Sequence, residues 1–316
     1  MPKTLNEVYS ARSMKRRYEV WFLRLGLADG SGAWWFRYLL MNPGRNGCNA
    51  HPQGMPVQVW ATWFPRDGDA QHWIQGFPLQ ELTLSARQQS PFTFSAGGNS
   101  IADQSCRGQM SVEGHEIRWD LRCDSRFRAT LSNKSWIGFS RTPHSDAQFS
   151  GEITLDGRTL RGEPLGVGVQ GHNCGFRHRN FWTWTHAVFA NPDGSLSTLE
   201  ALVYEMPMGL VFRKALLWHD GEGLQFKDFR EEFRDRGSLE WRFRAPGKNG
   251  AQIKVAIDGT GRSIHRLPYL KTDCSGTFEV ANNSLASARV TLTRPGQPAV
   301  LLESRGGAVL EMVGDL

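Results

Sequence analysis

The residues with the clearest potential for chemistry lie together just past the middle of the chain. Between residues 172 and 186 the sequence places three histidines, two asparagines, one cysteine and two tryptophans. Such a set can transfer protons, orient a substrate and form an apolar wall. The first half of the stretch is punctuated by glycine, and the second half alternates as a β-strand would.

His172 and Asn173 follow a glycine-rich run, Gly168-Val169-Gln170-Gly171, and precede Gly175. These glycines permit a backbone that points polar side chains inward or lets a ligand approach closely. His172 would then act as an acid or base, with Asn173 orienting it or the substrate. The alternative is a His-Asn pair that only satisfies buried backbone groups at the end of a barrel.

His186 ends a run in which Trp182, Trp184 and His186 are spaced to share one face of a strand. Buried beside two indoles, this imidazole would have a lowered pKa and be neutral. The tryptophan faces could stabilise a developing carbocation. The group is therefore either the wall of an apolar pocket with a proton-transfer residue or a well-packed core.

His172, His178 and His186 could also be imagined as a metal triad. Their spacings of six and eight residues match no common zinc pattern, and the sequence has no HExxH motif. We therefore predict no metal. A nucleophilic role for Cys174 lacks a partner acid, so a small buried cysteine is the better interpretation.

The rest of the chain predicts an all-β protein. Six Asp-Gly dipeptides lie between apolar runs, and such dipeptides favour the tight turns of β-hairpins. Alternating segments predict strands, and Val57 to Phe64 is apolar on both faces. These segments are 18–27, 33–41, 117–123, 239–244 and 253–257. Helical signals are confined to Leu79–Arg87, a short segment before Tyr18, and the spacing of Phe226, Phe229 and Phe233, where a strand and loop fit nearly as well.

The turn-rich segment from Ser140 to Gly168 is the best candidate for a domain boundary. We expect two antiparallel β-barrels packed side by side, the first over residues 1–164 and the second over 165–316. Closing or stacking the sheets would avoid exposed edges.

Two charged residues lie inside strand-like runs. Arg37 and Tyr38 follow one another, so one of them must point inward, and a buried arginine needs an acidic partner. Glu200 alternates with Leu199 and Ala201, which places it on the less apolar face, where it would be surface decoration.

Composition narrows the class of function. The net charge of +6 is spread singly, without a basic stripe, so we predict no nucleic-acid partner, and peripheral contact with a membrane stays open. Five cysteines without a CxxC pair argue against a disulfide framework and a zinc site. No signal peptide or membrane span is evident, so we expect a cytoplasmic protein in a reducing setting. No nucleotide fingerprint occurs in a βαβ context, and we predict no cofactor.

The pattern Gly-x-Gln-Gly-His172-Asn173-x-Gly, six residues, then Trp182-x-Trp184-x-His186 resembles a superfamily of lipocalin-like two-barrel proteins that includes carotenoid 1,2-hydratase and tocopherol cyclase. Segments 34–38, 117–121 and 307–311 are similar to other strands of that group. The resemblance implies two lipocalin-like barrels and a hydrophobic, often isoprenoid-like substrate. It also implies cofactor-free chemistry that begins by protonating a carbon–carbon double bond.

Two departures from the hydratase pattern matter. Gly171 stands where the hydratases carry an aspartate, and Cys174 stands where many relatives have tryptophan. The presumed proton donor is therefore missing, and His172 or His186 would have to take its role. We predict an enzyme of cyclase or hydratase type, with Asn173 orienting the substrate. Its substrate-binding residues would be Gln170, Cys174, His178, Trp182 and Trp184. The alternative is a non-catalytic carrier of a lipid or pigment.

Overall fold

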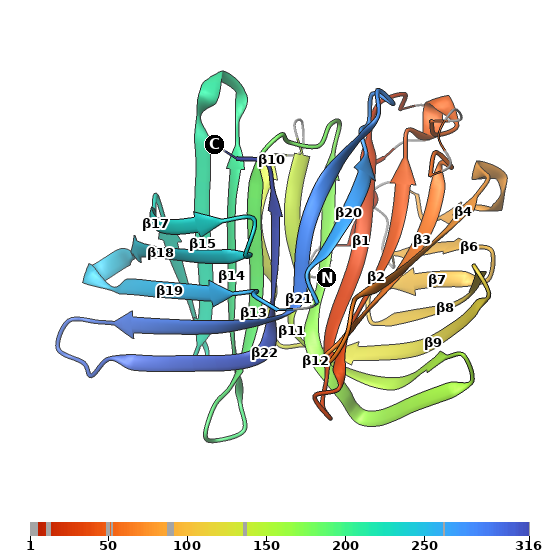
Figure 1. The fold of residues 1–316 in the computed structure, drawn as a ribbon. Helices are drawn as coiled ribbons and strands as arrows, with labels where there is room; N and C mark the ends of the chain where they lie inside the picture. Colours follow the sequence, from red (N-terminus) through yellow and green to blue (C-terminus); the bar gives the residue numbers. More distant parts are fainter. Residues whose placement is uncertain are drawn as a thin grey trace.

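The computed structural model describes residues 6–10, 14–48, 51, 53–86, 92–134, 138–261 and 263–315. Within these ranges the protein consists of two antiparallel β-sheets. Each sheet curls around its own apolar core, which gives two barrels side by side (Figure 1). The prediction of an all-β protein with two barrels is confirmed.

The first barrel is a twelve-stranded sheet in the order β4-β3-β2-β1-β12-β11-β9-β8-β7-β6-β5, with β10 paired to β11. Its strands are β1 (Tyr18–Leu27), β2 (Gly32–Met41), β3 (Val57–Pro65), β4 (Gln71–Phe77), β5 (Thr83–Leu84), β6 (Thr93–Ala96), β7 (Asn99–Ala102), β8 (Ser105–Val112), β9 (His115–Asp124), β10 (Ala129–Lys134), β11 (Gly138–Leu155) and β12 (Arg158–Gly175).

The second barrel is a ten-stranded sheet in the order β16-β15-β14-β13-β22-β21-β19-β18-β17, with β20 paired to β21. Its strands are β13 (Trp182–Ala190), β14 (Leu196–Glu205), β15 (Val211–His219), β16 (Glu222–Lys227), β17 (Arg230–Asp235), β18 (Glu240–Pro246), β19 (Gln252–Asp258), β20 (His265–Leu270), β21 (Thr277–Thr293) and β22 (Val300–Val313).

The predicted hairpin around Asp29-Gly30 is confirmed as β1 and β2, and the other alternating segments are confirmed as β3, β9, β18 and β19. The helix expected over Leu79–Arg87 is wrong for the described residues. A single 3-10 turn, η2 (Leu79–Glu81), leads directly into β5 because Leu82 is already extended and buried; Arg87 lies outside the described residues. Three other 3-10 turns are η1 (Pro43–Arg45), η3 (Pro207–Gly209) and η4 (Lys248–Gly250). Phe226 lies in β16 and Phe233 in β17, with Phe229 in the loop between them, so the alternative of a strand and loop is confirmed for this segment.

The expected domain boundary, between residues 164 and 165, falls inside β12. This strand pairs with β1 from Gly166 to Gly175, so the sheets part only after Gly175. A connection of six residues, 176–181, then leads into β13 of the second barrel.

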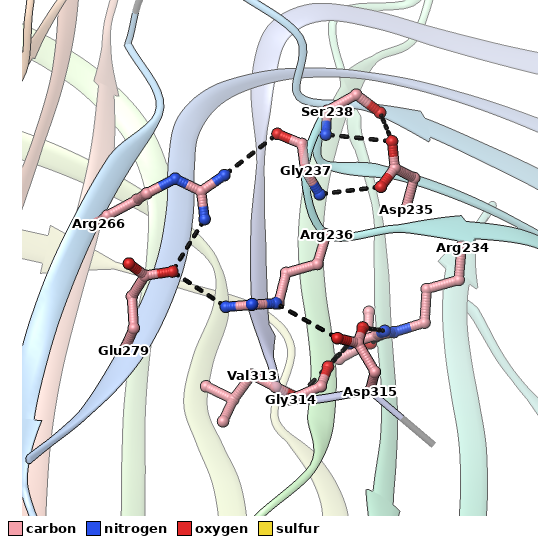
Figure 2. Close-up of polar contacts among 11 residues, drawn as sticks. Arg234, Asp235, Arg236, Gly237, Ser238, Arg266, Glu279, Val313, Gly314 and Asp315 are labelled. Carbon is pink, nitrogen blue, oxygen red and sulfur yellow. Dashed lines mark hydrogen bonds and ion pairs between the residues drawn. The ribbon is translucent and has the colours of Figure 1, made fainter.

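Arg234 ties the free edge of the second barrel to the strands that carry the tryptophans. From β17 it donates hydrogen bonds to Thr183 Oγ1 (2.8 Å) and the Gly314 carbonyl (2.7 Å) and pairs with Asp315 (3.0 Å). Figure 2 shows that Asp315 also pairs with Arg236, which with Arg266 shares the Glu279 carboxylate. The network links β17 and the residue after it to elements that β17 does not pair with.

A disulfide joins Cys48 of the first barrel to Cys274 of the second. The cysteine count argued against a disulfide framework, and the structure has this single disulfide, because chain folding brings together two residues 226 positions apart. The three remaining cysteines are free and buried. The described part of the chain contains no helix with the length and hydropathy of a membrane span.

Candidate functional site

The best candidate site is an apolar cavity of about 160 Å³ between the two barrels. A cavity of about 150 Å³ can hold a benzene molecule, so this one accommodates a ring-sized group. The side chains around it come from both barrels and include Tyr18, Phe22, Trp35, Arg37, Asn173, Cys174, Trp182, Trp184, Tyr204, Tyr269 and Glu311.

Strand alternation decides which residues reach this cavity. On β2, Trp34, Phe36 and Tyr38 point into the first barrel and join its core. The residues between them, Trp35 and Arg37, point outward to the second barrel and line the cavity. The outward face of β2 is thus covered by the second barrel, so both faces of this strand are buried.

Arg37 and Glu311 form a buried ion pair at the cavity. Arg37 Nη2 donates to Glu311 Oε2 at 3.1 Å, and the two side chains are each 11% exposed. The Trp182 Nε1–H donates to the other carboxylate oxygen at 2.9 Å. Burial lowers the pKa of Arg37, and Glu311 opposes that shift. This is the acidic partner that the sequence required for a buried arginine.

Aromatic rings surround this ion pair. The Arg37 guanidinium lies 4.1 Å from the Trp35 ring centre and 4.8 Å from that of Tyr269. The ring centres of Trp35 and Trp184 lie 6.1 Å apart, and the Phe22 ring packs edge-on against Trp184. Cation–π contacts of this kind stabilise a desolvated guanidinium. The site therefore combines three indole walls with the Arg37–Glu311 ion pair, and Arg177 and Arg179 also line it.

The second half of the predicted stretch reaches the cavity. Trp182 and Trp184 line it, and from the glycine-rich half Asn173 and Cys174 do so as well. Cys174 is buried, and burial raises the pKa of its thiol, which agrees with a small buried cysteine. The cavity lies between the barrels rather than at the start of the second one.

His172 and Gln170 point the other way, into the first barrel. His172 is fully buried, stacks on Trp21 and lies 2.9 Å from Glu19 Oε1. That carboxylate also accepts hydrogen bonds from the backbone N–H groups of Tyr9 and Ser10. Neither His172 nor Gln170 is among the residues around the cavity. The structure therefore separates His172 from Asn173.

His186 is buried between the barrels and does not line the cavity either. Its Nε2 lies 2.7 Å from the Ser145 carbonyl, and burial lowers its pKa to about 3. A neutral imidazole that donates to this carbonyl ties β13 to β11 of the other barrel.

His178 lies in the connection between the barrels. Its ring stacks on Tyr18 at 4.1 Å, and burial together with Arg37 lowers its pKa to about 3. It borders a smaller side cavity rather than the main one. Thus none of the three histidines lines the main cavity.

The surroundings of Gly171 leave no space for the aspartate that the hydratases carry at this position. Gly171 faces the second barrel with Asn173, and a Cβ at this position would lie 2.1 Å from Phe22 Cζ. The phenyl ring therefore occupies the space that a side chain at residue 171 would need. An aspartate there is excluded unless Phe22 moves.

Sequence reasoning missed three residues of this region: Glu200, Tyr269 and Glu311. Glu200 is buried and not surface decoration, since the outward face of β14 packs on the first barrel. Its carboxylate accepts a hydrogen bond from Trp184 Nε1 at 3.0 Å, and burial raises its pKa to about 7. Glu311 lies in segment 307–311, whose sequence indicated only a strand similar to one in the lipocalin-like group. No motif or spacing in the sequence singled out Tyr269.

A larger groove of about 740 Å³ lies on the second barrel, with only Arg66 of the first barrel at its edge. Its lining is strongly charged: Arg289 pairs with Glu303 at 2.6 Å and Arg242 with Glu240 at 2.8 Å, and Arg66, Asp258 and Arg305 line it as well. A hydrophobic molecule is therefore better matched by the smaller aromatic cavity. Among the described residues no group of three or more metal-ligating side chains is assembled.

Comparison with known proteins supports the fold. No family model matches the sequence, and no curated protein matches it. Kievitone hydratase from Nectria haematococca is 11% identical, with a TM-score of 0.56 over 99% of this chain and 95% of that one. An AttH protein from Nitrosomonas europaea is 14% identical, with a TM-score of 0.52 over 98% and 95%. CghA is 11% identical, with a TM-score of 0.58 over 95% and 88%. At these identities the similarity establishes a shared two-barrel fold.

Proposed function

We propose that this protein is a cofactor-independent enzyme of hydratase or cyclase type. It acts by acid/base chemistry at a carbon–carbon double bond of a hydrophobic small molecule. One observation carries the proposal: the cavity between the barrels has walls of Trp35, Trp182 and Trp184 and contains the Arg37–Glu311 pair. A purely structural interface would not need a buried ion pair beside an apolar cavity.

The charges in the cavity favour one version of this chemistry. A carbocation would develop beside the buried guanidinium of Arg37, which repels it. An enolate would instead be stabilised by Arg37, as oxyanions are by preorganised donors. We therefore infer a double bond conjugated to a carbonyl group, whose oxygen binds Arg37.

Proton transfer can then be assigned to one carboxylate. Glu311 accepts a proton from a water molecule or from a substrate hydroxyl. At the same time, the oxygen of that water or hydroxyl bonds to the β-carbon. The carbon–carbon π electrons move to give an enolate at Arg37. Glu311 returns the same proton to the α-carbon, so the net reaction is addition of O–H across the double bond. Negative charge passes from Glu311 to the enolate and back, and Arg37 keeps a counter-ion throughout.

The test uses aryl enones with and without a hydroxyl group ortho to the carbonyl, incubated with the purified protein in ¹⁸O-labelled water. A gain of one labelled water in the mass spectrum indicates hydration, and an isomer of unchanged mass indicates cyclisation. Glu311→Gln should lower kcat at least about 100-fold. Glu303→Gln, on the same strand but half exposed, should leave kcat unchanged. Turnover by Glu311→Gln at the rate of the unmodified protein would overturn the assignment.

The carrier remains a second candidate, favoured by the placement of His172 and His186 away from the cavity. A carrier would retain an unmodified ligand, whereas an enzyme releases its product. Solvent extraction of the purified protein followed by mass spectrometry separates the two. A stoichiometric lipid or pigment, with no enone converted, would establish the carrier.

Within the cell, we propose the location expected from the sequence, the cytoplasm. The disulfide tests this proposal, because cytosolic thiols are normally kept reduced. Thiol trapping of the protein in intact cells should show the Cys48 and Cys274 thiols reduced if the location is correct.

A further inference from the structure

A side cavity of about 40 Å³ adjoins the main cavity. Val20, Arg37 and Tyr269 border both cavities, so these three residues form the junction between them. Beyond the junction, the side cavity continues between β2, β3 and the end of β20.

The walls of the side cavity are apolar. Leu39 and Met41 continue the outward face of β2, Trp60 comes from β3, and Leu270 ends β20. All four are buried, and three of them belong to the same apolar cluster between the barrels. An occupant would therefore be surrounded by carbon on nearly every side.

The polar groups near these walls are unavailable to an occupant. Trp60 Nε1 donates to Gln58 Oε1 at 2.8 Å, and Gln58 Nε2 donates to two backbone carbonyls. The Tyr269 hydroxyl, His178 Nδ1 and Gln53 Oε1 have no hydrogen-bond partner, but each exposes less than 1 Å². A polar occupant would thus lose its hydration without compensation, which is costly.

We propose that the side cavity is a subsite for a short aliphatic branch of the ligand, whose oxygenated ring occupies the main cavity. This rests on the proposed function only in that the main cavity binds the ligand. The volume is about a quarter of that of a cavity that holds benzene, which corresponds to a branch of about two carbon atoms. Arg37 at the junction sets the distance between the ligand oxygen and the branch.

The experiment measures binding of alkyl phenyl ketones, with alkyl chains from methyl to butyl on the carbonyl carbon, by quenching of tryptophan fluorescence. Each methylene that enters the side cavity should lower Kd about fourfold. The gain should stop near the ethyl compound, and longer chains should bind no better. Met41→Ala enlarges the cavity and should move the optimum to a longer chain. Leu39→Trp fills it and should abolish the gain.

Trp184→Phe serves as the matched control, because Trp184 lines the main cavity only. It should change Kd by a similar factor for every ketone and leave the optimal chain length unchanged. Affinity that increases steadily through butyl, an optimum unmoved by Met41→Ala, or no binding by any ketone would each overturn the subsite. If the chain-length profile is as expected while enone turnover does not depend on Glu311, the subsite stands and the proposed chemistry fails.

Discussion

Thr142 Oγ1 lies 2.7 and 2.8 Å from the two carboxylate oxygens of Glu200, and this contact crosses from one barrel to the other. Thr142 belongs to β11 and Glu200 to β14. Because Glu200 also accepts the Trp184 indole N–H, the contact links the barrel interface to a wall of the cavity. Lys214, which is near Glu200, spans the same interface by donating to the Thr130 carbonyl at 2.8 Å.

Stability should therefore depend on the protonation of Glu200. Burial raises its pKa from 4.5 to about 7, so between these values the folded state binds a proton that the unfolded state has lost. The free energy of unfolding should fall as pH rises through this window, by about 3 kcal/mol in total, and stay level above it. Urea denaturation of the unmodified protein and Glu200→Gln from about pH 4 to about pH 8 measures this.

Glu200→Gln should remove most of this pH dependence, and it should gain stability relative to the unmodified protein above about pH 7. The half-exposed Glu303 offers the control, since Glu303→Gln should leave the pH profile intact. Parallel profiles for the unmodified protein and Glu200→Gln would show that Glu200 does not titrate in this range.

Arg37→Met should destabilise the protein by about 3–5 kcal/mol, because it leaves the Glu311 carboxylate buried without its counter-ion. Adding Glu311→Gln should restore part of that loss, and a double-mutant cycle from denaturation measures the coupling. The exposed Arg289–Glu303 pair provides a matched cycle, in which the coupling should stay below about 1 kcal/mol. Equal couplings in the two cycles would mean that Arg37 and Glu311 are effectively solvated.

Arg234→Met should cost about 2 kcal/mol and expose the β17 edge, since its hydrogen bonds to Thr183 and Gly314 close the second barrel. Hydrogen exchange should accelerate in β17 and at the start of β13. Arg244, on the neighbouring strand and paired with Glu232 at the surface, supplies the comparison. Arg244→Met should change neither stability nor exchange measurably.

Reduction of the Cys48–Cys274 disulfide should lower the free energy of unfolding by about 5 kcal/mol, from the entropy of closing a loop of 226 residues. Denaturation with and without a thiol reductant gives the difference. Alkylation of the denatured protein should count three thiols before reduction and five after it. Five thiols before reduction would contradict the disulfide.

Strand positions were predictable from sequence because alternation is a local property. The grouping of Trp182, Trp184 and His186 on one face is confirmed by their common position on the outward face of β13. Alternation cannot say what covers that face. The sequence predicts that Glu200 lies at the surface, whereas the first barrel covers it in the structure.

The chemistry of the site was harder to predict because its residues are far apart in sequence. Arg37 and Glu311 are separated by 274 positions, and Tyr269 belongs to a third segment. The local density of His172, Asn173 and His178 pointed to one site, but strand alternation sends His172 and Asn173 to opposite faces. The pairing of Cys48 with Cys274 in a disulfide also depends on the tertiary structure, and the odd number of cysteines in the sequence does not predict it.

The disulfide turns residues 48 to 274 into a covalent ring. The ring contains the connection at 176–181, through which the backbone passes from β12 of the first barrel to β13 of the second. A single cut there, by a protease or by design, would leave both barrels attached through the sulfur atoms. The protein should thus tolerate new chain termini between the barrels, and the cavity walls would then be held together by packing and one cross-link.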